Sequence, residues 1–122
     1  MPQALAHGVE YLERSPDFSV VHGIGVLFEC AVVRGTRQVR CDPYVQRSVT
    51  APTSAARLLD HWSSYTTTYY SIHRTEHLRR NMARCVEHGF GFGFSELFLS
   101  GCSVIQGKAH AMNRLYMVRE LH

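Results

Sequence analysis

The stretch that decides the fold is residues 71–89, SIHRTEHLRRNMARCVEHG. At helical spacing its core-facing residues fall on one side: Ile72, Thr75, Leu78, Met82, Cys85 and Val86. The opposite side collects a strip of cationic and imidazole side chains: His73, His77, Arg80, Arg84 and His88. Gly89 is typical of a left-handed helix end, and basic residues in the last turns suit its negative pole. The pattern predicts one helix over residues 71–88.

The region before this helix is expected to form a β-hairpin. Residues 25–34 are rich in branched side chains, and the glycine in Arg34-Gly35-Thr36-Arg37 predicts a two-residue turn at Gly35-Thr36. That turn places Cys30 opposite Cys41, close enough for a disulfide. We expect both to be free thiols because no secretory signal is present. The predicted core face of the hairpin consists of Phe28, Cys30, Val32, Val39 and Cys41.

The other elements follow from shorter patterns. Residues 2–14 and a segment beginning at Ala55 are predicted helices, the latter ending in a break at threonines 66–68. Phenylalanine alternates with glycine over residues 90–94, which predicts a strand extended by 97–99 and followed by a short strand at 104–105. Residues 112–121 fit a strand or a helix, and we favour the strand. The sequence thus predicts a single compact α+β domain over residues 1–122. Its antiparallel sheet would combine an N-terminal hairpin and a C-terminal meander, with two or three helices packed on one face.

Composition limits the class of protein. At 13.9 kDa, with 45% apolar and 19% charged residues, the chain has an ordinary globular balance. No stretch approaches the roughly 20 apolar residues of a membrane helix. Residues 1–16 lack the basic start and apolar run of a signal peptide, which favours a cytoplasmic location. The net charge of +3 is mildly basic.

One short string resembles a catalytic motif. His73-Arg74-Thr75-Glu76-His77 is an H-x-x-E-H match and resembles the inverted zinc-protease signature. The resemblance implies a zinc ion held by His73 and His77, with Glu76 as a base. It covers five residues, lies opposite the predicted core stripe, and lacks a recognisable third ligand. We therefore expect no metal and no cofactor.

These patterns favour a non-enzymatic binding protein over an enzyme. The strip, with Arg74 on its flank, would engage an anionic surface, either nucleic acid or an acidic site on a protein that handles nucleic acid. Arg34, Arg37 and Arg40 around the hairpin tip would form a second basic point. In its size and absence of catalytic motif the chain is similar to inhibitors encoded by phages and mobile elements, including anti-CRISPR proteins.

Two alternatives from other classes remain open. One is a zinc-dependent hydrolase built on His73, Glu76 and His77. The other is a structural subunit that forms a homodimer or larger homo-oligomer through an edge made by Phe90, Phe92 and Phe94.

Overall fold

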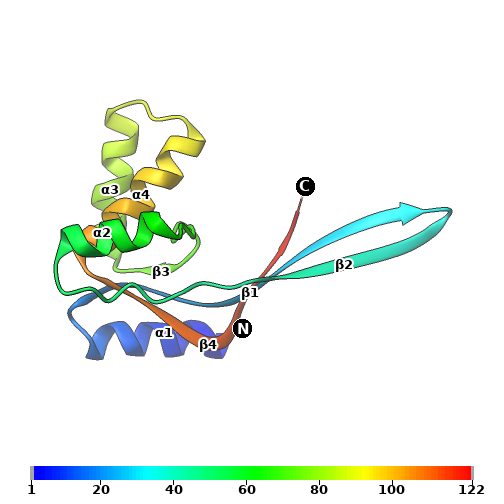
Figure 1. Ribbon diagram of the computed structural model, residues 1–122, viewed down its shortest axis with the longest axis horizontal. Helices are drawn as coiled ribbons and strands as arrows, with labels where there is room; N and C mark the ends of the chain where they lie inside the picture. Colours follow the sequence, from blue (N-terminus) through cyan, green and yellow to red (C-terminus); the bar gives the residue numbers. More distant parts are fainter. Residues whose placement is uncertain (1, 122) are drawn as a thin grey trace.

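The computed structural model describes residues 2–121, and over these residues it has the α+β fold that the sequence predicts (Figure 1). The elements in chain order are α1 (Pro2–Arg14), β1 (Phe18–Val33), β2 (Thr36–Tyr44), α2 (Ser54–Ser63), β3 (Ile72–His73), α3 (Thr75–Glu87), α4 (Phe92–Gln106) and β4 (Lys108–Glu120). No helix within this part of the chain is long and apolar enough to cross a membrane.

Strand β1 organises the sheet because every other strand pairs with it. It forms the predicted hairpin with β2 and also pairs with the short β3, both antiparallel. The C-terminal segment is the strand that we favoured, β4, and it lies parallel to β1 from Phe18↔Lys108 to Phe28↔Glu120. The first and last strands of the chain therefore share a long ladder, which fixes both ends of the sequence to one sheet.

The hairpin turn lies one residue earlier than predicted. Arg34 and Gly35 have φ angles of 51° and 79°, the conformation of a type I′ turn, whose twist matches that of the strands. Val33 therefore pairs with Thr36, and Cys30 pairs with Val39 rather than with Cys41. The predicted pairing of the two cysteines is wrong, although both are free thiols, as expected.

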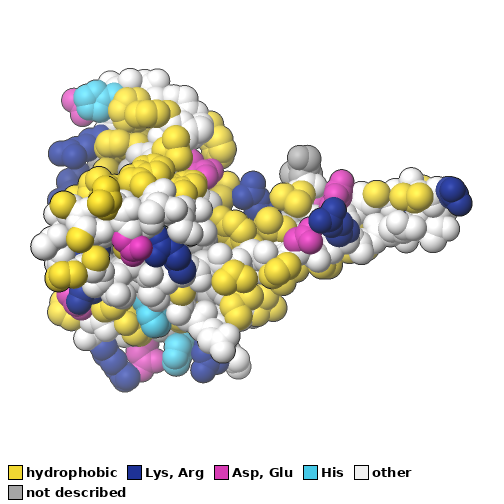
Figure 2. Space-filling model, viewed as in Figure 1, with side chains coloured by type: hydrophobic (Ala, Val, Ile, Leu, Met, Phe, Trp, Pro, Cys, Tyr) yellow, Lys and Arg dark blue, Asp and Glu magenta, His cyan; other side chains and the backbone are white. Residues whose placement is uncertain are grey.

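The distal part of the hairpin, residues 29–41, projects away from the rest of the molecule, and we call it the arm (Figures 1 and 2). Every residue of the arm is exposed, including Val32 at 70% and Val39 at 63%. The prediction that Cys30, Val32, Val39 and Cys41 face the core is therefore wrong. Apolar side chains do share one face of the hairpin, but no helix extends far enough to cover the arm.

Helices lie on both sides of the sheet. The neighbouring residues Val20 and Val21 point to opposite faces, and each is buried in a separate cluster. Val20 packs with Val104 of α4 and with Leu58 of α2, while Val21 packs with Leu12 of α1 and with Met112 of β4. The helices α2, α3 and α4 form a layer on one side, and α1 covers the other (Figure 1).

The decisive stretch is only partly the helix that we predicted. Ile72 and His73 form β3 in the sheet, Arg74 precedes the first turn, and α3 begins at Thr75. The branched side chain of Ile72 suits its strand position opposite Val21. The end of the helix is as expected: His88 caps it and Gly89 has a φ of 63°.

The predicted core stripe of α3 is also mostly wrong. Among its members only Cys85 is fully buried, alongside the polar Asn81, whereas Val86 is 80% exposed. The helix packs on α4 along its Asn81–Cys85 side, where the Asn81 amide exchanges hydrogen bonds of 2.9 and 3.1 Å with Gln106.

Residues 92–106 form helix α4, so the strands predicted over residues 90–99 and 104–105 are wrong. The glycine–phenylalanine alternation continues into the first turn of the helix, and from Phe94 onward the apolar residues Phe98, Cys102 and Ile105 recur at helical spacing. The expected break between the preceding helices is confirmed, since residues 65–68 are neither helix nor strand. Helix α4 therefore replaces the predicted C-terminal meander and forms the centre of the helical layer.

Candidate protein-binding surface

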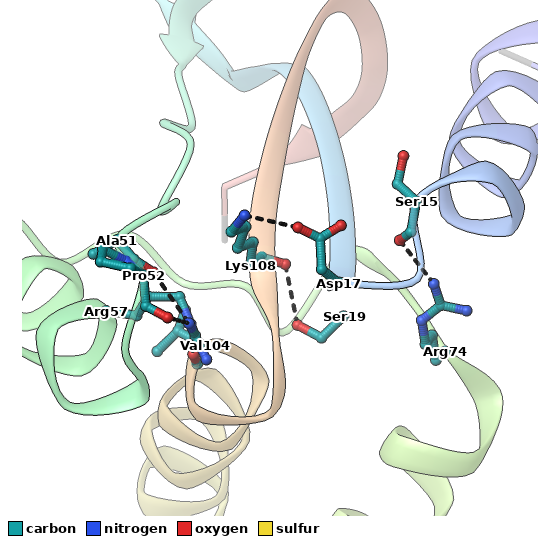
Figure 3. Close-up of polar contacts among 9 residues, drawn as sticks. All are labelled: Ser15, Asp17, Ser19, Ala51, Pro52, Arg57, Arg74, Val104 and Lys108. Atoms are coloured by element: carbon teal, nitrogen blue, oxygen red, sulfur yellow. Dashed lines mark hydrogen bonds and ion pairs between the residues drawn. The ribbon is translucent and has the colours of Figure 1, made fainter.

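One residue of the predicted strip, His73, and Arg74 on its flank have structural positions instead. His73 lies in β3, where its Nε2 atom is 2.8 Å from the carbonyl oxygen of Thr68, and burial lowers the pKa of its imidazole. Arg74 donates hydrogen bonds of 2.7, 2.8 and 3.0 Å to the carbonyl oxygens of Leu12, Phe18 and Ser15 (Figure 3). Its guanidinium thereby ties the end of α1 to the start of β1, so neither side chain is free to meet a partner.

The other four strip residues lie along one flank of α3 or at its end, and we call them the α3 flank: His77, Arg80, Arg84 and His88. Arg80 and Arg84 are exposed, and neither forms an ion pair within residues 2–121. The imidazole of His88 stacks on the ring of Phe90 at 5.4 Å. Burial lowers the pKa of His77, and the nearby Arg80 and Arg74 lower it further. The permanent positive charges of the flank are those of Arg80 and Arg84.

An apolar groove of about 300 Å³ lies between α2 and α4. Its lining residues, which we call the α2–α4 groove, are Leu58, Trp62, Phe94, Leu97, Phe98, Gly101, Cys102 and Ile105. Several of these side chains are large and exposed in the free chain, among them Trp62 at 44% and Phe94 at 57%. Apolar side chains gathered over the helical layer are visible in Figure 2. Exposed apolar surface of this kind is typical of a binding site.

The groove and the flank are adjacent, and Cys102 connects them. Cys102 lines the groove from α4, and burial raises the pKa of its thiol. The positive charges of Arg84 and Arg80 act in the opposite direction on the same thiol, and α3, which carries both arginines, packs against α4, one wall of the groove. An apolar floor with a cationic border is therefore a single surface.

No carboxylate lines the α2–α4 groove within the described residues. Asp60 of α2 turns away from the groove and forms an ion pair with Arg47, with the two atoms 3.0 Å apart. Glu96 of α4 lies near the hydroxyl of Tyr65, at 3.5 Å, and is also absent from the groove lining. The electrostatic sign of the surface is thus set by Arg80 and Arg84.

The zinc-like string borders a different hollow. A cavity of about 400 Å³ between α1, β3 and the start of α3 is lined in part by His73, Glu76 and His77. His73 belongs to the strand and its Nε2 faces a backbone oxygen, so the two histidines do not share a helix face as the motif requires. In residues 2–121 no three His, Cys, Asp or Glu side chains are arranged to hold a metal ion.

The second basic point lies at the tip of the arm, far from the helical layer (Figure 1). Arg34 and Arg37 have no carboxylate partner among the described residues, while Arg40 forms an ion pair with Asp42 at 3.0 Å. The structure therefore does not bring the two predicted basic regions together.

The groove is the feature that sequence reasoning missed. Its signal was present in the spacing of Leu58 and Trp62 and of Phe94, Phe98 and Ile105, which places each set on one helix face. The period-two alternation over residues 90–94 hid the second set, because a strand was assigned there. No family model, curated protein or solved structure matches this chain.

Proposed function

We propose that this protein is a non-enzymatic binding protein that takes up an acidic, amphipathic segment of another protein. The observation that carries the proposal is the adjacency of the α2–α4 groove to Arg80 and Arg84, two exposed arginines without a carboxylate partner in the described chain. An amphipathic helix would place its apolar face on the groove and its carboxylates on the guanidinium groups.

The apolar groove favours a protein partner over nucleic acid. A duplex would lay its phosphates on the arginines but would offer the groove no apolar surface of comparable extent. A protein segment would contact both the groove and the arginines. Aromatic residues that binding would bury, such as Trp62, would supply most of the affinity, and the arginines would supply selectivity.

Synthetic peptides provide a direct test. Fluorescence anisotropy would compare three probes: an amphipathic helix with glutamates on its polar face, the same helix with lysines there, and a 20-base-pair DNA duplex. We expect the acidic helix to bind and the other two to bind at least about 10-fold more weakly, which corresponds to about 1.4 kcal/mol. Equal binding of both peptides would remove the role of the arginines, and preferential binding of the duplex would replace the protein partner by nucleic acid.

Neighbouring arginines supply a matched control. Arg80→Glu combined with Arg84→Glu should weaken binding of the acidic helix by about 100-fold, because two attractive contacts become repulsive. Arg79→Glu makes the charge change of one of these two substitutions, one residue away but on a different side of α3, and it should leave the affinity within about threefold. Affinity should also fall steeply between low and moderate salt. An effect of Arg79→Glu as large as that of the double variant would mean that only net charge matters.

The same proposal extends to a biological role and location. Occupying the acidic segment of a protein that handles nucleic acid would block that protein, which is the inhibitor role considered from the sequence. All four cysteines are free, and free thiols suit a reducing compartment, so the partner is sought in the cytoplasm.

A further inference from the structure

The two faces of the arm differ sharply in chemistry. Cross-strand partners share a face, so the register assigns one face to Phe28 with Cys41, Cys30 with Val39, and Val32 with Arg37. The opposite face carries Glu29 with Arg40, Ala31 with Gln38, and Val33 with Thr36. We call the first face the valine face. Within the arm it has a single charged residue, Arg37, which lies at the tip. It has the pattern of a core-facing sheet, yet it lies in solvent.

The valine face continues beyond the arm into the three-stranded part of the sheet. Val26 pairs with Pro43 on one side and with Val118 on the other, so these three side chains lie on the same face as Phe28. Pro43 is exposed and Val118 is 44% exposed. The uncovered apolar surface therefore runs from the root of the arm to its tip.

We propose that a second copy of this chain covers the valine face, with the two arms packed face to face and running in opposite directions. A two-fold axis would pass through the cross-strand pair of Cys30 and Val39. It would place the Val32–Arg37 pair of each arm over the Phe28–Cys41 pair of the other arm. Such an interface is isologous, since the same surface is used twice, and it closes at two copies. This assembly lies beyond the proposed function and uses a different region of the molecule.

Charge complementarity supports a second copy as the occupant. The valine face has one cation, Arg37, at its tip and one anion, Glu120, at its root, beside Phe28. Neither forms an ion pair within residues 2–121. Opposed arms bring Arg37 of each copy to the root of the other, over Cys41 of β2, from where its guanidinium has to reach across β1 to meet the second copy's Glu120 on β4. The face is thus complementary to itself in charge as well as in apolar character.

Adjacent valines on opposite faces give the sharpest test. Val32 lies on the valine face and Val33 on the other, and both are exposed, at 70% and 44%. By analytical ultracentrifugation of the full chain we expect a reversible dimer, with Val32→Asp raising its dissociation constant at least about 30-fold, the scale of losing a central interface residue. Val33→Asp should change it less than about threefold. A wild-type chain that stays monomeric at the highest soluble concentration, or equal effects of the two variants, would overturn the proposal.

Two further measurements test the direction of packing. Arg37→Glu should weaken the dimer, and combining it with Glu120→Arg should restore it; failure of the double variant to recover would exclude opposed arms. Mild oxidation should trap the dimer through Cys30, which lies at the axis, so Cys30→Ser should abolish the covalent dimer while Cys41→Ser retains it. Trapping that depends on Cys41 alone would contradict this axis. All these substitutions lie outside the α2–α4 groove and the α3 flank, so their failure would leave the proposed function standing.

Discussion

The interior of the protein contains several polar side chains, whereas the outer surface of the helical layer and the arm exposes many large apolar ones. Inside, the fully buried side chains include His22, His61, Ser100 and Thr68 beside the expected valines. Outside, large apolar side chains lie in water, among them Leu59 at 76%, Phe92 at 70% and Val86 at 80%. Polar groups are buried at a cost unless they are hydrogen-bonded, and apolar groups are exposed at a cost unless they meet a partner. Each region therefore has to be explained by its contacts.

Two of these buried polar side chains, His22 and Ser100, are hydrogen-bonded, whereas His61 Nε2 and Thr68 Oγ1 have no hydrogen-bond partner among the described residues. His22 has Ser71 Oγ at 3.1 Å from Nδ1 and the carbonyl oxygen of Arg47 at 3.2 Å from Nε2. The hydroxyl of Ser100 accepts a hydrogen bond of 3.1 Å from the backbone N–H of Thr68. These contacts join segments that form neither helix nor strand to the sheet and to α4. The polar groups inside therefore hold the irregular segments in place, whereas the apolar side chains outside remain available for binding.

The largest expected effect is at Arg57, the clearest case of a polar residue inside. Its guanidinium donates to the carbonyl oxygens of Val104 and Ile105 in the last turn of α4, at 2.7 and 3.1 Å, and to those of Ala51 and Pro52 (Figure 3). Arg57→Met should lower the free energy of unfolding by about 4 kcal/mol, because several buried acceptors lose a charged donor.

Urea denaturation would measure this loss, and Arg57→Lys serves as the control. Lysine keeps the charge but loses the planar fork, so it should recover only part of the stability. An unchanged urea midpoint for Arg57→Met would show that the stability of the fold does not depend on this buried polar contact. It would contradict the structural role given to the polar interior.

The next effect concerns pH. Burial lowers the pKa of His22 from 6.5 to about 4, so the folded protein holds this imidazole neutral while the unfolded chain binds a proton at higher pH. The stabilisation is complete above pH 6.5 and is lost as the pH falls through about 4. Its full size is on the order of 3 kcal/mol. Burial also lowers the pKa of His61 and His73, which acts in the same direction.

Urea midpoints measured from pH 7.5 to pH 4 would test this expectation. The wild-type protein should lose stability progressively below pH 6.5, and His22→Gln, which cannot titrate, should be less stable at pH 7.5 but show a shallower decline. If the urea midpoints of the two proteins declined in parallel with falling pH, the acid sensitivity would come from groups other than His22.

Local patterns in the sequence predicted much of the fold. The helix over residues 2–14, the hairpin, the break after α2 and the C-terminal strand depend on nearby residues, and the structure has each of them. The turn was placed one residue late because the position of Gly35 alone does not distinguish a type I′ from a type II′ turn. The pairing of the two cysteines depended entirely on that choice.

The burial of particular faces could not be predicted in the same way. In α3 the helical wheel favoured Met82 and Val86 as core residues, but α4 packs instead on the side that carries Asn81 and Cys85. Which side is covered depends on a helix that the sequence had assigned as strands. The sequence also did not predict the structural positions of His73 and Arg74, since the stretch interpreted as one helix starts with strand β3 and α3 begins only at Thr75. The site prediction placed Arg80 and Arg84 on an open face, where they lie.

The smallest expected effect is at Leu59, a leucine of α2 that is 76% exposed. Leu59→Ala removes an apolar side chain that already lies in water, so the free energy of unfolding should stay within about 0.5 kcal/mol of the wild type. Leu99→Ala is the matched control in α4, since Leu99 is 1% exposed and its truncation should cost about 3 kcal/mol through the cavity that it leaves. If Leu59→Ala cost as much as Leu99→Ala, then Leu59 would be packed in solution, and the apolar exterior would already be covered in the free protein. A small effect at Leu59 means that its apolar surface contributes little to folding, which leaves it free to contribute to binding.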